Sequence, residues 1–237
     1  SAASDVYKRQ VYDCATKEDV VGQIFSMMLP MLLMIFLFSG CMAVAPESIA
    51  GEKERGTIAT LLVTPMKRSS LALGKIISLS AIALLSGLSS FLGTMLSLPN
   101  LMGMDAGSGM DASVYSVADY GLLLGLILTT VLLLVAVISI ISAMSKSVKA
   151  AGTAISPLMI VVMGISLIPM FSGGGESSIA YSFIPIFNSV RSMYDIFSFQ
   201  CSTVNVVLTM VCNLIYAGIL TFVLTRMFND EKIMFSK

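Results

Sequence analysis

Five long stretches of the sequence contain no aspartate, glutamate, lysine or arginine. Each exceeds the roughly 20 apolar residues that an α-helix needs to cross the hydrocarbon core of a bilayer. They cover residues 20–46, 76–104, 120–145, 150–175 and 196–225, with the last span itself expected over 200–225. The sequence therefore predicts an all-α integral membrane protein with about five transmembrane helices.

The composition excludes several classes of function. Only 12% of the residues are charged, against roughly a quarter in soluble domains. The 14 basic and 14 acidic residues balance, so the chain lacks the basic face of a nucleic-acid-binding protein. The absence of histidine removes the usual general base and the commonest zinc ligand. Four cysteines without C-x-x-C spacing favour packing over metal or redox chemistry.

Basic residues are divided unequally between the two sides that alternate along the predicted spans. One side carries Lys8, Arg9, Lys17 and Arg191. The other carries the remaining basic residues, which are Lys53, Arg55, Lys67, Arg68, Lys75, Lys146, Lys149, Arg226, Lys232 and Lys237. Because loops rich in lysine and arginine stay in the cytoplasm, the second side is predicted to be cytoplasmic.

This orientation places the start of the chain outside the cell, and the predicted spans include none that would carry it there. We therefore expect an N-terminally truncated six-helix protein, in which residues 1–19 are an external or non-native leader and residues 20–237 form the transmembrane domain.

The predicted cytoplasmic loop 47–75 gathers four consecutive charged residues, Glu52, Lys53, Glu54 and Arg55. The sequence "TIATLLVTP" follows, bounded by a glycine before it and by a proline at its end, which predicts a helix of about two turns. Its apolar face would be formed by Ile58, Leu61 and Leu62. Such a face favours docking into a groove of a partner protein; the alternative is a basic loop that only sets topology.

The stretch "AGEKERGTIATLLVTPMKRSSLALGK", Ala50 to Lys75, resembles the corresponding loop of type 2 ABC exporter permeases, closest to the sodium-exporting NatB kind. In that family the loop carries a coupling helix that seats in a cleft of the ATP-binding subunit. The resemblance implies that the seat is formed by Glu52, Lys53, Glu54, Arg55, Gly56, Thr57, Ile58, Leu61, Leu62 and Pro65. It also implies a second permease subunit, in a homo- or heterodimer, and a place among the lipids of a bacterial inner membrane.

The sequence has no phosphate-binding loop of the G-x-x-x-x-G-K-[ST] type. The only Gly-Lys pair, Gly74 and Lys75, lacks the upstream glycine. We therefore expect that this chain holds no cofactor and no catalytic site, and that ATP and magnesium are bound by a separate subunit. The resemblance also implies a first span followed by a large external domain, and we expect both to be missing from this truncated chain.

Two further segments are predicted to pack or to lie outside the membrane. Gly121 and Gly125 fit the small-xxx-small pattern that brings helix backbones together. The external segment 176–199 has apolar residues at helical spacing, and its Arg191 can pair with Asp195 one turn later. It predicts a short helix that lies at the membrane interface or dips into it.

Two other classes of function compete with an ATP-driven exporter. A secondary transporter or channel needs no ATPase but would require charge within a span or a recognisable selectivity filter, and the sequence has neither. An intramembrane hydrolase would need a Ser-Lys pair, and no lysine lies within a span. The substrate remains open between sodium, which follows from the resemblance, and drugs, peptides or lipids.

Overall fold

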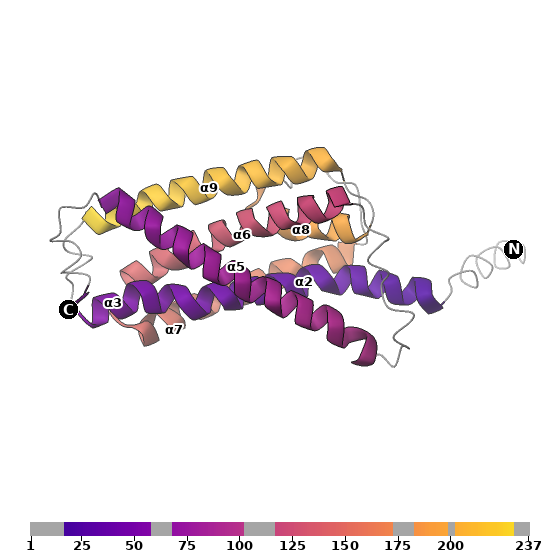
Figure 1. Ribbon diagram of the computed structural model, residues 1–237, viewed down its shortest axis with the longest axis horizontal. Helices are drawn as coiled ribbons and strands as arrows, with labels where there is room; N and C mark the ends of the chain where they lie inside the picture. The colour runs from indigo at the N-terminus through magenta and orange to yellow at the C-terminus, as the bar shows by residue number, and fades with distance from the viewer. Residues whose placement is uncertain (1–16, 58–67, 102–116, 173–182, 199–201, 230–237) are drawn as a thin grey trace, which may run out of the picture.

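The protein is an all-helical bundle in the computed structural model, which describes residues 17–57, 68–101, 117–172, 183–198 and 202–229 (Figure 1). These ranges contain helices and turns and no strand, which confirms the predicted fold class. The elements are α2 (Lys17–Pro46), the π-helix η1 (Glu47–Gly51), α3 (Glu52–Glu54), α5 (Arg68–Leu101), α6 (Val117–Met144), α7 (Val148–Ser172), α8 (Phe187–Phe197) and α9 (Thr203–Asn229).

Five helices within the described ranges are long and apolar enough to cross a membrane, as predicted. Their candidate spans are Met27–Glu54, Ser70–Ser89, Ala118–Met144, Val148–Pro169 and Thr203–Phe228. The helix ends differ from the ends of the charge-free stretches. The first helix continues through η1 and α3 to Glu54 instead of ending at Pro46, and α5 begins at Arg68 instead of Ile76. Charged residues end an apolar stretch without ending a helix, because Glu, Lys and Arg are good helix formers. Both ends of the segment predicted as loop 47–75 are therefore helical.

Helix α6 occupies the centre of the bundle. Its membrane window is 61% buried inside the protein, whereas that of α7 is 22% buried. It packs against α2, α5, α7, α8 and α9, and it runs side by side with α9 (Figure 1). Because α6 is apolar on all sides, it can be surrounded by other helices, while α7 leaves most of its surface for lipid.

Helix α5 crosses α2 obliquely (Figure 1), and small residues bring the two backbones close. A Cβ atom on Gly40 of α2 would lie 3.1 Å from the carbonyl oxygen of Ala83 and 3.2 Å from the Cβ of Ser86. A Cβ on Gly87 of α5 would lie 2.5 Å from Leu37 Cδ2. A small-residue contact of this kind allows the dispersion attraction that holds helices together in lipid.

The two glycines of the small-xxx-small pair have different surroundings. A Cβ on Gly125 would lie 2.4 Å from Met210 Cε, so the absence of a side chain there leaves room for the end of the Met210 side chain of α9. Gly121 is exposed, and a Cβ on it would meet no atom within 4 Å. Within the described part of this chain, only Gly125 of the pair therefore contacts a neighbouring helix.

The short helix α8 lies inside the bundle rather than along its surface. Ten of its residues, from Asn188 to Phe197, are buried, and α8 packs against α2, α6, α7 and α9. The predicted short helix is present, and other helices of the same chain cover it. Its position at the membrane interface stays a prediction. The predicted pair within it is present, since Arg191 Nε lies 3.1 Å from Asp195 Oδ1.

Candidate functional site

The charged run Glu52–Arg55 lies at one end of the bundle, together with the C-terminal end of α6 and the N-terminal end of α7. We call this the basic end, because Lys53, Arg55, Lys75, Lys146 and Lys149 belong to its helix termini. The run sits on the helical extension of α2. Of the residues predicted to contact a partner, Ile58, Leu61, Leu62 and Pro65 lie outside the described residues.

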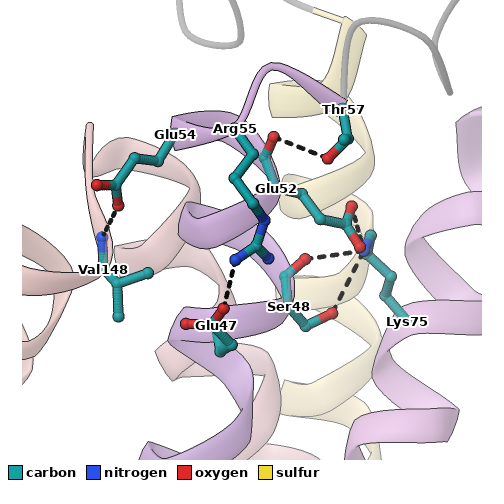
Figure 2. A network of polar contacts seen from close by, with 8 residues as sticks. All are labelled: Glu47, Ser48, Glu52, Glu54, Arg55, Thr57, Lys75 and Val148. Atoms are coloured by element: carbon teal, nitrogen blue, oxygen red, sulfur yellow. Dashed lines mark hydrogen bonds and ion pairs between the residues drawn. The ribbon is translucent and has the colours of Figure 1, made fainter.

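The helical extension ends at Gly56, the residue that was predicted to precede the coupling helix. The φ angle of Gly56 is +74°, a left-handed conformation that glycine adopts without steric cost. The amide of Gly56 donates to the carbonyl of Lys53 at 3.1 Å, and the hydroxyl of Thr57 donates to the carbonyl of Glu52 at 3.1 Å (Figure 2). These bonds satisfy carbonyls that a helix C-terminus leaves free, so the chain leaves the helix in a fixed direction.

Glu52 joins the extension to α5 (Figure 2). Lys75 Nζ lies 2.7 Å from Glu52 Oε2, and the two side chains are 10% and 25% exposed. Lys75 also donates to the carbonyl oxygen of Ser48 at 2.9 Å and to its hydroxyl at 3.3 Å. An ammonium group with three oxygen neighbours is fully hydrogen-bonded. Lys75 therefore holds the start of α5 against the end of α2.

Lys53 and Glu54 join the extension to the turn between α6 and α7. Lys53 Nζ donates to the carbonyl oxygen of Ala143 at 3.2 Å, in the last turn of α6. Glu54 Oε2 accepts from the amide of Val148 at 3.0 Å (Figure 2), the first residue of α7. The cation thus meets the negative end of one helix dipole and the carboxylate meets the positive end of the next, both of which are favourable.

Arg55 makes its contact within the extension. Its Nη1 lies 2.6 Å from Glu47 Oε1, and both side chains are more than half exposed (Figure 2). The hydrogen bond to Glu47, and then the charge of that carboxylate, raise the pKa of the Arg55 guanidinium. A Cβ on Gly51 would lie 3.1 Å from atoms of both side chains, so this glycine leaves room for the pair.

We call Glu52, Lys53, Glu54 and their partners Lys75, Ala143 and Val148 the basic-end network. It ties the end of α2 to α5, α6 and α7. The same charges were predicted to form a contact surface for a partner, or a loop that only sets topology. Two of the internal partners are backbone atoms 90 and 94 residues away in the sequence, which no side-chain pattern could reveal.

A second polar group lies around α8. The amide of Asn213 on α9 donates to Ser189 Oγ at 2.9 Å and to Thr130 Oγ1 on α6 at 3.4 Å, and its oxygen accepts from Asn188 at 3.2 Å. One turn earlier on α9, the hydroxyl groups of Thr209 and Ser192 lie 3.0 Å apart. We call these six residues the α8 network. The polar residues at positions 209 and 213, one turn apart within an apolar span, were the signal that could have predicted it.

The described residues include no group of three or more Cys, Asp or Glu side chains that could hold a metal ion. Five apolar helices, with their charged side chains gathered at helix ends, define a multi-pass membrane protein.

The profile of the ABC-2 family transporter proteins matches residues 4–226 of the chain. The chain belongs to this family, whose members form the transmembrane component of an ABC transporter and do not themselves carry the ATPase site. It is also 32% identical, over 171 residues, to the ABC transporter permease protein NatB of Bacillus subtilis (strain 168). That alignment covers 69% of this chain and 42% of NatB. No solved structure matches the chain.

Proposed function

We propose that this chain forms the membrane-spanning part of an ATP-driven exporter in a bacterial cell membrane, with the basic end facing the cytoplasm. The base count of the two sides supports this orientation. A separate ABC subunit binds ATP and magnesium and supplies the driving force. It acts together with this chain and a second permease subunit.

The observation that carries the proposal is the position of the basic-end network. The segment predicted to be the coupling helix begins at Thr57, directly after Gly56, where the helical extension ends. Glu52, Lys53 and Glu54 connect that extension to α5, α6 and α7. A force applied to the segment by an ATPase therefore reaches three further helices. The apolar face of Ile58, Leu61 and Leu62 fills the groove of the partner.

Sodium is the proposed substrate, because the charged loop resembles the NatB kind and the chain is 32% identical to NatB. Everted membrane vesicles loaded with a sodium-sensitive dye would measure this transport on addition of ATP. ATP-driven uptake of a drug or peptide, with no uptake of sodium, would show that sodium is not the substrate and would still support an ATP-driven exporter.

The test of the partner is co-expression of the chain with an ABC ATP-binding subunit from the same genome. We expect the purified chain to hydrolyse no ATP alone, and the complex to hydrolyse ATP and transport. Leu61→Asp should weaken binding by a factor of about 30 or more, because burial of an unpaired charge costs about 2 to 5 kcal/mol. Thr60→Asp adds the same charge on another side of the predicted helix and should bind normally. Full binding and transport by Leu61→Asp would refute the coupling-helix assignment.

The competing function is a carrier that needs no ATPase, and one observation favours it. Arg191 and Asp195, which belong to no span, are buried among the spans, and ionisable residues in such a position often line an ion path. The energy source separates the two functions. Transport that persists after ATP depletion and stops when the ion gradients are collapsed would support the carrier and overturn the exporter.

A further inference from the structure

The α6–α7 turn at the basic end is a rigid unit. On its α6 side, the amide of Ser145 donates to the carbonyl of Ser142 at 3.2 Å. On its α7 side, the amide of Ala151 donates to the carbonyl of Ser147 at 3.0 Å. The hydroxyl of Ser147 accepts from the amide of Ala150 at 3.1 Å and caps the start of α7. A force on one residue of this turn therefore displaces the ends of both helices.

The extension of α2 is a second rigid unit, fixed by the bonds of Gly56 and Thr57 described above. Within the extension, the π-helix η1 joins α3 to the long helix α2. π-helical turns are rare and are often found at functional sites. Lys53 and Glu54 each reach across to a terminal backbone group of the α6–α7 turn. The positive charge of Lys53 lies at the C-terminal end of α6, and the negative charge of Glu54 lies at the N-terminal end of α7, so each charge is favourable for the helix dipole that it meets.

We propose that Lys53 and Glu54 are positioning residues that transmit displacement of the segment after Thr57 to the α6–α7 turn. The inference rests on the proposed function, in which an ATPase displaces that segment. In this role Lys53 and Glu54 contact the α6–α7 turn of their own chain and do not contact the ATPase. The two cytoplasmic connections, 47–75 and the α6–α7 turn, then move together.

The charge-exchanged variant Lys53→Glu/Glu54→Lys tests this directly, because it keeps the net charge and reverses the sign at both helix ends. We expect the variant to bind the ATPase and hydrolyse ATP like the wild type. The amount of substrate exported per ATP hydrolysed should fall about fivefold or more, which is the size of effect that coupling between two sites of a protein typically has. Lys53→Arg and Glu54→Gln keep a donor for Ala143 and an acceptor for Val148, so both should retain most of the coupling.

Two controls separate positioning from other roles. Asp119→Lys reverses a charge in the first turn of α6, at the opposite end of the bundle, and should leave export per ATP unchanged. The melting temperature of each variant reports structural damage. If the double variant does not fold, the same measurement is made on Glu54→Lys alone, because position 54 is exposed to solvent.

The outcomes distinguish this inference from the proposed function. Wild-type export per ATP in the exchanged variant would overturn the positioning role and leave the exporter intact. Loss of ATPase binding in that variant would also overturn it, since Lys53 and Glu54 would then belong to the docking surface. A wild-type chain that binds no ATPase would refute the proposed function, and the inference would fail with it.

Discussion

The basic-end network and the α8 network both place polar groups among apolar helices, but they use charge differently. At the basic end, charged side chains bridge different helices, as Glu52 does to Lys75 and Glu54 does to α7. In α8, the ion pair of Arg191 and Asp195 lies within one helix. The bonds of the α8 network between α8 and α9 join neutral side chains.

This difference determines which helices can separate at low cost. Pulling apart a bridge between charged groups leaves each charge unpaired, which is costly where water is scarce. A hydrogen bond between neutral side chains in a membrane protein contributes only about 0.6 kcal/mol on average. The ends of α2 and α5, joined by Glu52 and Lys75, should therefore move as one unit. Helix α8 can shift against α9 while its own ion pair stays intact.

The largest expected effect is the loss of one charge from α8. Asp195→Leu leaves Arg191 buried without its carboxylate, which should lower the unfolding free energy by about 3 to 5 kcal/mol. Arg191→Met/Asp195→Leu removes both charges and should restore most of that loss. Titration with a denaturing detergent measures both variants. A double variant as unstable as the single one would show that the pair contributes more than mutual neutralisation.

Loss of the bridge to α5 should have the next largest effect. Lys75→Met removes the charged partner of Glu52 and two bonds to Ser48, and hydrogen bonds to charged groups contribute about 1.5 to 3 kcal/mol. Because the Glu52 side chain is 25% exposed, water can replace part of the interaction, so we expect a loss of about 2 kcal/mol. Glu52→Gln keeps an acceptor and should lose less. Equal stability of Lys75→Met and wild type would contradict the tight coupling of α2 to α5.

Loss of the neutral bonds should matter less. Asn213→Leu removes the central residue of the α8 network, whose three side-chain bonds contribute about 1 to 2 kcal/mol together. Val211→Leu, on an exposed part of the same helix, is the matched control. A loss as large as that of Asp195→Leu would show that α8 is held as firmly as the basic end and would remove the contrast.

The sequence predicted the parts of this fold that depend on local pattern. Apolar length predicted the number of spans, and helical spacing predicted the Arg191–Asp195 pair. It did not predict that Glu54 caps α7, because the partner is the amide of Val148, and every residue except proline has such an amide. It also left the depth of α8 open, since the same amphipathic pattern fits an interface or the inside of a bundle.

The smallest expected change in stability is that of Arg55→Gln. The pair of Arg55 and Glu47 is more than half exposed on both sides, and exposed ion pairs contribute little because water and salt screen them. The variant should therefore unfold like the wild type. If Arg55 contacts the ATPase, as its place beside the proposed coupling helix suggests, the variant should bind that subunit about two- to fivefold more weakly, mainly through slower association. Comparison of binding at low and high salt tests the charge directly, since the difference between variant and wild type should shrink as salt rises. Unchanged binding at low salt would exclude Arg55 from the docking surface and leave that surface to the apolar face after Thr57.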